Sequence, residues 1–275
     1  MPKGEHKYDK DAEKIEAKEE KHAAKQEARE AREHRQEERR DARDEHQDDR
    51  ADQRDIQKFL TEFRAADELY FADISELNSS RVEGFAFIAV DRNGPGKEDD
   101  VINVLLSAEN LQAGLHIKHI HGFGDGRDAV TPTIAADRPE NGGDGDGFLE
   151  LAEGAPAYGP ILVNLTPFDT FTSDGSTIVF NNSFHLPSGD ASHDSAAHAG
   201  DAITTFDNLD LNHFVIHGLR VPTSVGVGTP GEVGVTDGDD YKEALPVAIG
   251  EIERVSFDQA ATLLKTAYAQ GFDFA

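Results

Sequence analysis

The stretch VINVLLSAENLQAGLHIKHIHGF, residues 101–123, decides how the rest of the chain is interpreted. It holds two strand-like apolar runs around a bend at SAEN, and the second run carries His116, His119 and His121 within six positions. Alternate residues of a strand share a face, so His119 and His121 point to one side and His116 to the other. The stretch therefore predicts a β-strand with a pair of imidazoles on one face.

The segments around this stretch have the same character. β-branched and aromatic runs, from RVEGFAFIAVD (81–91) to PVAIGEIERV (246–255), are broken by Gly, Asp, Asn and Pro. Short strands with turn residues between them, and no helical period, predict an antiparallel β-sandwich or barrel over residues 79–255.

Residues 9–58 contain almost only charged residues, Gln, His and Ala, a composition that is also typical of disorder. Basic residues recur at steps of three or four from Lys10 to Lys58, and a second, acidic track runs from Asp9 to Asp55. Two tracks at the helical period predict one long solvated helix after a disordered tail over residues 1–8. Since no apolar seam is present, the helix could self-associate through its charge stripes, dock on the acidic body or act as a spacer.

Two further segments are predicted to flank the β-region. Residues 59–78 carry an apolar face and form an amphipathic connector that packs on it. Residues 256–275 return to helix, where Ser256 and Gln259 match a capping box and Gly271 can end the helix before the tail GFDFA.

The net charge of −27 belongs mostly to the folded body. Residues 1–58 hold 16 of the 27 basic and 19 of the 54 acidic residues, which leaves 11 basic and 35 acidic residues for 59–275. Such a body repels nucleic acid and anionic membranes, and a small anion is disfavoured as a substrate unless local cations reverse the field.

Composition also bears on the compartment. The chain has no Cys, so disulfides and thiolate metal sites are excluded, and neither a membrane-spanning run nor a classical signal peptide is visible. An acidic, Asp/Gly-rich chain of this kind suits either export without a leader or a cytoplasmic location.

A metal site on the first pair of histidines needs a third ligand. Two imidazoles at i and i+2 on a strand can reach one ion. His217, in HFVIHG, ends an apolar strand and is the best partner, whereas His213 lies about 13 Å farther along that strand. At most one of these two joins the pair, and His185 and His116 are additional candidates.

The order of these motifs resembles that of copper/zinc superoxide dismutases. AENLQAGLHIKHIHGFGD (108–125) is similar to that family's strand ending in H-x-H-x-F-G-D, and NHFVIHG (212–218) to its late strand ending in Val-Val-His. GTPGEVG (228–234) and LPVAIGEI (245–252) look like its Gly-rich loop and last strand. HIHG followed by GPILVNL also resembles the chordin-type domain. The resemblance covers roughly residues 80–255 and implies a Greek-key sandwich or barrel.

The resemblance implies that His119, His121 and His217 are copper ligands. It fails elsewhere: no His or Cys lies between residues 122 and 184, so no zinc site is expected. The family's catalytic Arg aligns with Pro246, and only Lys242 or Arg220 is near enough in sequence to stand in for it. Arg220 and Lys118 are the candidate catalytic cations.

NGGDGDGFLELAE (141–153) fills the space of the family's zinc loop. Asp144, Asp146 and Glu153 match positions three, five and twelve of an EF-hand loop, and Glu150 adds a carboxylate. Position one is Gly142, for which Asn141 or Asp137 could substitute. The segment therefore predicts a calcium site, or else a solvated Asp-Gly turn.

Two functions follow from these features. One is a copper-binding, superoxide dismutase-like domain with possible redox activity toward superoxide. The other is a non-catalytic, chordin-like structural or binding module, stabilised by calcium and displayed on a charged helical stalk.

Overall fold

The structure is a computed structural model that describes residues 25–27, 29–30, 32–37, 39–40, 52–92, 100–165, 170–172, 177–186, 208–229, 232–234 and 240–274. Contacts within the chain divide it into one unit of residues 1–54 and a second unit of residues 55–275. The fold described below is that of the second unit.

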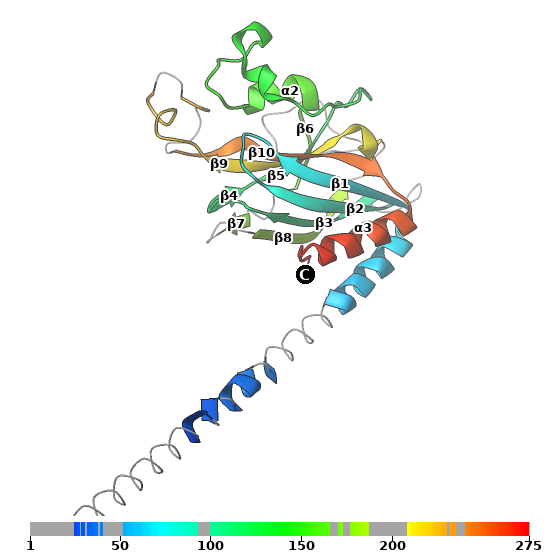
Figure 1. Ribbon diagram of the computed structural model, residues 1–275. Helices are drawn as coiled ribbons and strands as arrows, with labels where there is room; N and C mark the ends of the chain where they lie inside the picture. The colour runs from blue at the N-terminus through cyan, green and yellow to red at the C-terminus, as the bar shows by residue number, and fades with distance from the viewer. Residues whose placement is uncertain are drawn as a thin grey trace, which may run out of the picture. The chain divides into compact units, whose positions relative to one another are not determined.

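An antiparallel sheet of eight strands dominates this unit (Figure 1). The spatial order is β6-β5-β9-β10-β1-β2-β3-β8, and a second sheet pairs β4 with β7. The strands are β1 (Glu68–Glu76), β2 (Glu83–Asp91), β3 (Asp100–Glu109), β4 (Gly114–His116), β5 (Lys118–His121), β6 (Ile161–Asn164), β7 (Thr170–Thr172), β8 (Thr177–Leu186), β9 (His213–Arg220) and β10 (Tyr241–Arg254). The prediction of a mainly β, antiparallel fold is confirmed.

The eight strands curl around one hydrophobic core. Val163 of β6 and Ile178 of β8 come from opposite ends of the strand order, yet both belong to the same buried cluster. Several strands contribute alternate residues to this cluster, for example Ala86, Ile88 and Val90 of β2, as the two-residue period of a strand requires. One face of the sheet is therefore turned inward along its whole width.

A helical layer covers the outer face of β1, β2 and β3. The helical residues 55–65 contribute Phe59 and Phe63, and α3 (Phe257–Ala269) contributes Leu264 to a cluster with Phe71 and Phe87. The predicted capping box of α3 is confirmed, since Ser256 Oγ accepts from Gln259 N and Ser256 N donates to Gln259 Oε1. The C-terminal tail packs in the same layer through Phe272 and Phe274.

A third cluster lies on the outer face of β9 and β10, under α2 (Leu151–Tyr158). It joins Leu149 and Tyr158 to Val215 and Ile249. Figure 1 shows α2 above these strands, on the side away from β1, β2 and β3. The chain also has three short 3-10 turns, η1 (Ile134–Asp137), η2 (Pro139–Asn141) and η3 (Leu209–Leu211). Leu209 of η3 belongs to the inner core.

One part of the fold differs from the prediction, and another is described only in part. Residues 59–78, predicted as a connector, contain β1, which lies near the centre of the sheet between β10 and β2. Within the predicted helix of residues 9–58, the described pieces in 25–40 and 52–58 are helical, and Arg29 Nε lies 3.0 Å from Glu33 Oε1. The rest of that span, and residues 1–8, lie outside the described residues.

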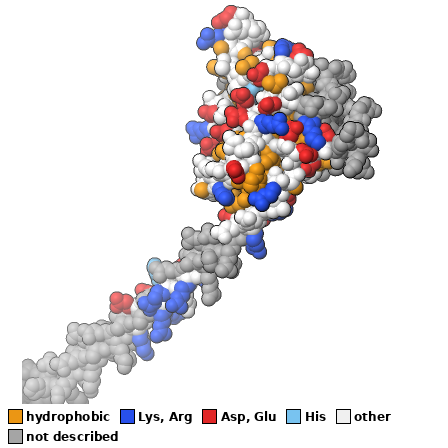
Figure 2. All heavy atoms as spheres, turned by 90° about the vertical axis from the view of Figure 1, so that its right-hand side faces the viewer, with side chains coloured by type: hydrophobic (Ala, Val, Ile, Leu, Met, Phe, Trp, Pro, Cys, Tyr) orange, Lys and Arg blue, Asp and Glu red, His pale blue; other side chains and the backbone are white. Residues whose placement is uncertain are grey.

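Charges of both signs lie on the surface of the folded unit. Figure 2 shows one face, on which acidic and basic side chains are interspersed around an apolar area. Arg92 forms ion pairs with Glu68 at 3.2 Å and Asp100 at 3.0 Å. Within the described part of the chain, no helix has the length and apolar content needed to cross a bilayer.

Candidate metal centre

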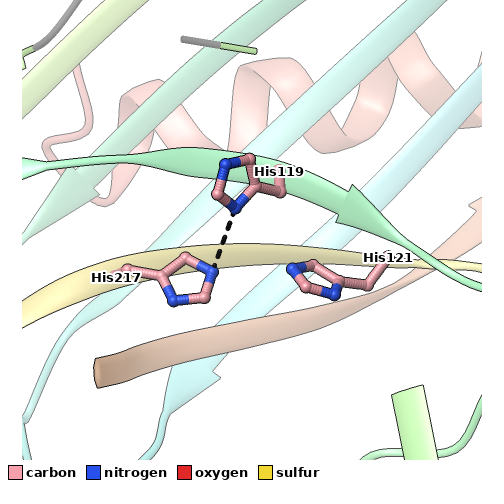
Figure 3. A group of neighbouring side chains, drawn as sticks. All are labelled: His119, His121 and His217. Atoms are coloured by element: carbon pink, nitrogen blue, oxygen red, sulfur yellow. Dashed lines mark hydrogen bonds between the residues drawn. The ribbon is translucent and has the colours of Figure 1, made fainter. Parts of the chain in front are cut away.

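Three buried histidines meet on the outer face of the sheet. His119 and His121 come from β5 and His217 from β9, and Figure 3 shows their rings turned toward one another. Each offers a ring nitrogen that lies within 4.8 Å of the other two. Their exposed fractions are 6%, 1% and 1%. We refer to these three residues as the histidine trio.

Strand pairing explains why the trio forms. β5 and β9 are antiparallel neighbours in which His119 pairs with Val215, and His217 N donates to Ile117 O at 2.9 Å. Directly paired residues share a face, and residues two apart on a strand share it too. His217 therefore lies beside His119 on the face opposite Ile120 and Ile216, which point into the core.

Two backbone carbonyls orient the trio. His217 Nδ1 lies 2.9 Å from Ala244 O, and His121 Nδ1 lies 3.0 Å from Gly159 O. A carbonyl oxygen only accepts, so Nδ1 carries the hydrogen in both rings and Nε2 keeps the lone pair. Metal-binding histidines commonly use the second ring nitrogen in this way, which fixes the tautomer and the ring plane.

An irregularity in β10 supplies one of these carbonyls. The register of β9 with β10 shifts on both sides of Pro246, which pairs with His217. Proline cannot donate to the strand ladder, and a shifted register redirects neighbouring backbone groups. The Ala244 carbonyl consequently faces the ring of His217 instead of belonging to a regular ladder.

Within the trio, His217 is neutral at ordinary pH. Burial lowers the pKa of His217 to about 4, although its hydrogen bond to Ala244 opposes the shift. His119 Nδ1 lies 3.3 Å from His217 Nε2, the contact drawn in Figure 3. Because His217 Nε2 holds a lone pair, His119 Nδ1 donates to it. Deprotonated imidazole nitrogens at this spacing can act as metal ligands.

The remaining candidate residues lie elsewhere. Both ring nitrogens of His116 face backbone carbonyls, those of His217 and Gln112, and His116 is outside the trio. Lys118 is fully buried, donates to His116 O and pairs with the core residue Ile216. Its ammonium group thus lies on the face opposite the trio.

The other predicted cation and histidine add no ligand. Arg220 is exposed, and its guanidinium lies 5.7 Å from the ring centre of Tyr241. The side chain of His185 lies outside the described residues. His213 is buried on the same face as the trio, but its Nε2 lies 3.0 Å from Thr131 Oγ1 and it does not join the trio. Of the two late histidines, the geometry selects His217.

A second potential metal group consists of Asp137, Asp144 and Asp146, each with an oxygen within 4.8 Å of the others. Asp137 is buried, and its carboxylate accepts from the backbone N–H groups of Gly145, Asp146 and Gly147. Burial and the neighbouring carboxylates raise the pKa of Asp146 to about 6. The loop thus brings together acidic groups that repel one another.

The two glutamates predicted for calcium are used mainly by the backbone. Glu153 accepts from Asp144 N at 3.2 Å and from Glu150 N at 2.9 Å, which caps α2. Glu150 Oε1 accepts from Gly234 N. Asp137, one of the two residues considered as a substitute for Gly142, is the third member of the aspartate group.

No local residue pattern indicates the two groups at the end of α2 that contact the trio, the ring of Tyr158 and the carbonyl of Gly159. A scan of protein-family models, a search of curated proteins and a search of solved structures each found no match to this chain.

Proposed function

We propose that the protein binds one transition metal ion at the histidine trio. The observation that carries this proposal is the convergence of three buried imidazoles whose ring nitrogens lie within 4.8 Å of one another. Histidine–metal bonds are about 2 Å long, so ligand atoms of one ion lie about 3–4 Å apart, a small contraction from the observed spacing. Removing three imidazoles from water costs free energy, which hydrogen bonds or a bound metal ion must offset.

Copper is the ion we propose. The donor set is three imidazoles without thiolate or carboxylate, and among first-row divalent ions imidazole sites hold Cu²⁺ most tightly. Burial also penalises charge that the ligands do not neutralise, which favours a monovalent ion over a divalent one. Bound copper would supply one-electron redox chemistry, while His119, His121 and His217 hold it.

We further propose that the sheet is a Greek-key barrel of the superoxide dismutase type. The connections support this proposal: β3 leads to β5, at the other side of the strand order, β6 leads back to β8 beside β3, and β9 returns beside β5. Connections that skip over neighbouring strands in this manner are typical of Greek keys. The trio also occupies positions that the resemblance assigns to copper.

The experiment that separates an enzyme from a binding module measures superoxide dismutation by the copper-loaded protein over a range of ionic strength. Any activity should rise with added salt, because the acidic body repels the anion and salt screens this repulsion. A rate that falls with salt would contradict this picture. Full copper occupancy without activity would favour the non-catalytic alternative.

The alternative function is a chordin-like structural module stabilised by calcium, and the aspartate group of the 137–149 loop favours it. Millimolar Ca²⁺ should then raise the melting temperature, since a cation offsets the repulsion around Asp146. A gain of 1 kcal/mol corresponds to about 2–4 °C at this size. Asp144→Asn should reduce the shift, and an unchanged melting temperature of the parent protein would remove this alternative.

A further inference from the structure

The ring of Tyr158 is packed directly against a member of the histidine trio. Tyr158 is fully buried at the C-terminal end of α2, and its ring centre lies 4.7 Å from that of His121 with an interplanar angle of 72°. Edge-to-face contacts at this distance are favourable and directional. The phenol donates to Leu151 O at 3.2 Å, which ties the ring back along its own helix.

Gly154 provides the space for this ring. A Cβ at position 154 would collide with the ring of Tyr158, one turn farther along α2. Glycine is an unfavourable residue inside a helix, by about 1 kcal/mol relative to Ala. Its presence here is therefore explained by the placement of Tyr158 and not by helix stability.

The next residue completes the contact. Gly159 has φ +84 and directs its carbonyl to His121 Nδ1 at 3.0 Å. A Cβ at position 159 would collide with the backbone of Gly122, so a glycine is required for this approach as well. The end of α2 thus makes two contacts with His121, one that fixes its tautomer and one that fixes its ring plane.

We propose that Tyr158 is a positioning residue of the histidine trio, and that the C-terminal end of α2 holds His121 in its ligand orientation. The ring of Tyr158 fixes the plane of His121 while the Gly159 carbonyl keeps the hydrogen on Nδ1, so that Nε2 faces the other two imidazoles. The consequence for metal retention rests on the proposed function, whereas the orientation of His121 does not.

The test records the histidine ring ¹⁵N signals of the full-length, metal-free protein by NMR and then titrates it with copper and with zinc. The parent protein should show His121 as a single Nδ1–H tautomer. In Tyr158→Ala the ring of His121 is free to rotate away from the Gly159 carbonyl, so both tautomers should be present. Metal binding should weaken about 10- to 100-fold, the loss typical of groups that orient a ligand. Tyr158→Phe keeps the ring and should behave as the parent.

A second variant leaves Tyr158 in place. Gly154→Ala improves helix propensity but displaces the ring of Tyr158, and it should reproduce the NMR and binding effects of Tyr158→Ala. Tyr268→Ala, which removes a tyrosine that packs on Phe274 in the other helical layer, should change neither. It controls for a general loss of stability.

The outcomes distinguish this proposal from the metal site itself. An unchanged His121 tautomer in both Tyr158→Ala and Gly154→Ala, or a tautomer mixture in the parent protein, would overturn the role of Tyr158 whatever the metal affinity. If none of the proteins binds metal but His121 still responds to both substitutions, positioning stands and the proposed function fails.

Discussion

Replacing His217 with Ala should lower the affinity for copper by more than about 100-fold. Even groups that only orient a metal ligand are worth about 10- to 100-fold, and this substitution removes a ligand from β9 itself. His121→Ala should have a comparable effect, because two imidazoles that remain cannot complete the coordination of the ion. Isothermal titration of the metal-free variants measures both.

His213→Ala is the matched control for His217→Ala. Both residues are buried histidines of β9 on the same face of the sheet, but only His217 belongs to the trio. His213→Ala should therefore keep stoichiometric binding. If His213→Ala lowers the affinity for copper as much as His217→Ala does, the ion is not held by the trio as described.

The metal-free protein should lose stability steeply between pH 6.5 and pH 4. Burial lowers the pKa values of His213 and His217 to about 4, from 6.5 in the unfolded chain. As the pH falls through this window, the unfolded state binds protons that the folded state does not bind, so the free energy of unfolding decreases. Each histidine accounts for roughly 3 kcal/mol, which is large against a typical total of about 5–15 kcal/mol.

Asp146 opposes this loss in part. Its pKa is raised to about 6 in the folded protein, so the folded state binds this proton first and becomes more stable as the pH falls. His213→Gln isolates the contribution of one histidine. In this pH window the variant should take up about one proton fewer on unfolding, which lowers the slope of the free energy of unfolding against pH. Urea unfolding at several pH values measures the slope. Parent and variant curves with equal slopes would show that His213 is not a buried neutral imidazole.

Residue patterns predicted most strands of the sheet but not β1. β2 alternates between core and outer layer with clear turns on both sides, and it was recognised. β1 has apolar residues in contact with the core and with the helical layer, for instance Tyr70 and Phe71, so no two-residue period marks it as a strand. α2 was missed because Gly154 and Pro156 lie inside it and a Glu, instead of Ser or Thr, precedes it.

The candidate site was partly predictable. The two-residue spacing of His119 and His121 placed them on one face. The position of His217 at the end of an apolar strand made it the best partner, and the geometry brings it beside them. His116 and Lys118 were candidates by proximity in sequence, but hydrogen bonds and strand alternation turn them away from the trio. The contacts from Ala244, Tyr158 and Gly159 depend on a shifted strand register and on glycine packing, which no local pattern records.

We expect His119, His121 and His217 to hold one ion together. The most direct measurement loads the full-length protein with one equivalent of Cu²⁺ and counts the coordinating imidazoles by pulsed electron paramagnetic resonance. We expect one copper ion per chain, magnetically coupled to three histidine rings, and coupling to only two rings in His217→Ala. Copper that stays unbound, or that couples to the same number of rings in the parent protein and in His217→Ala, would contradict the assignment.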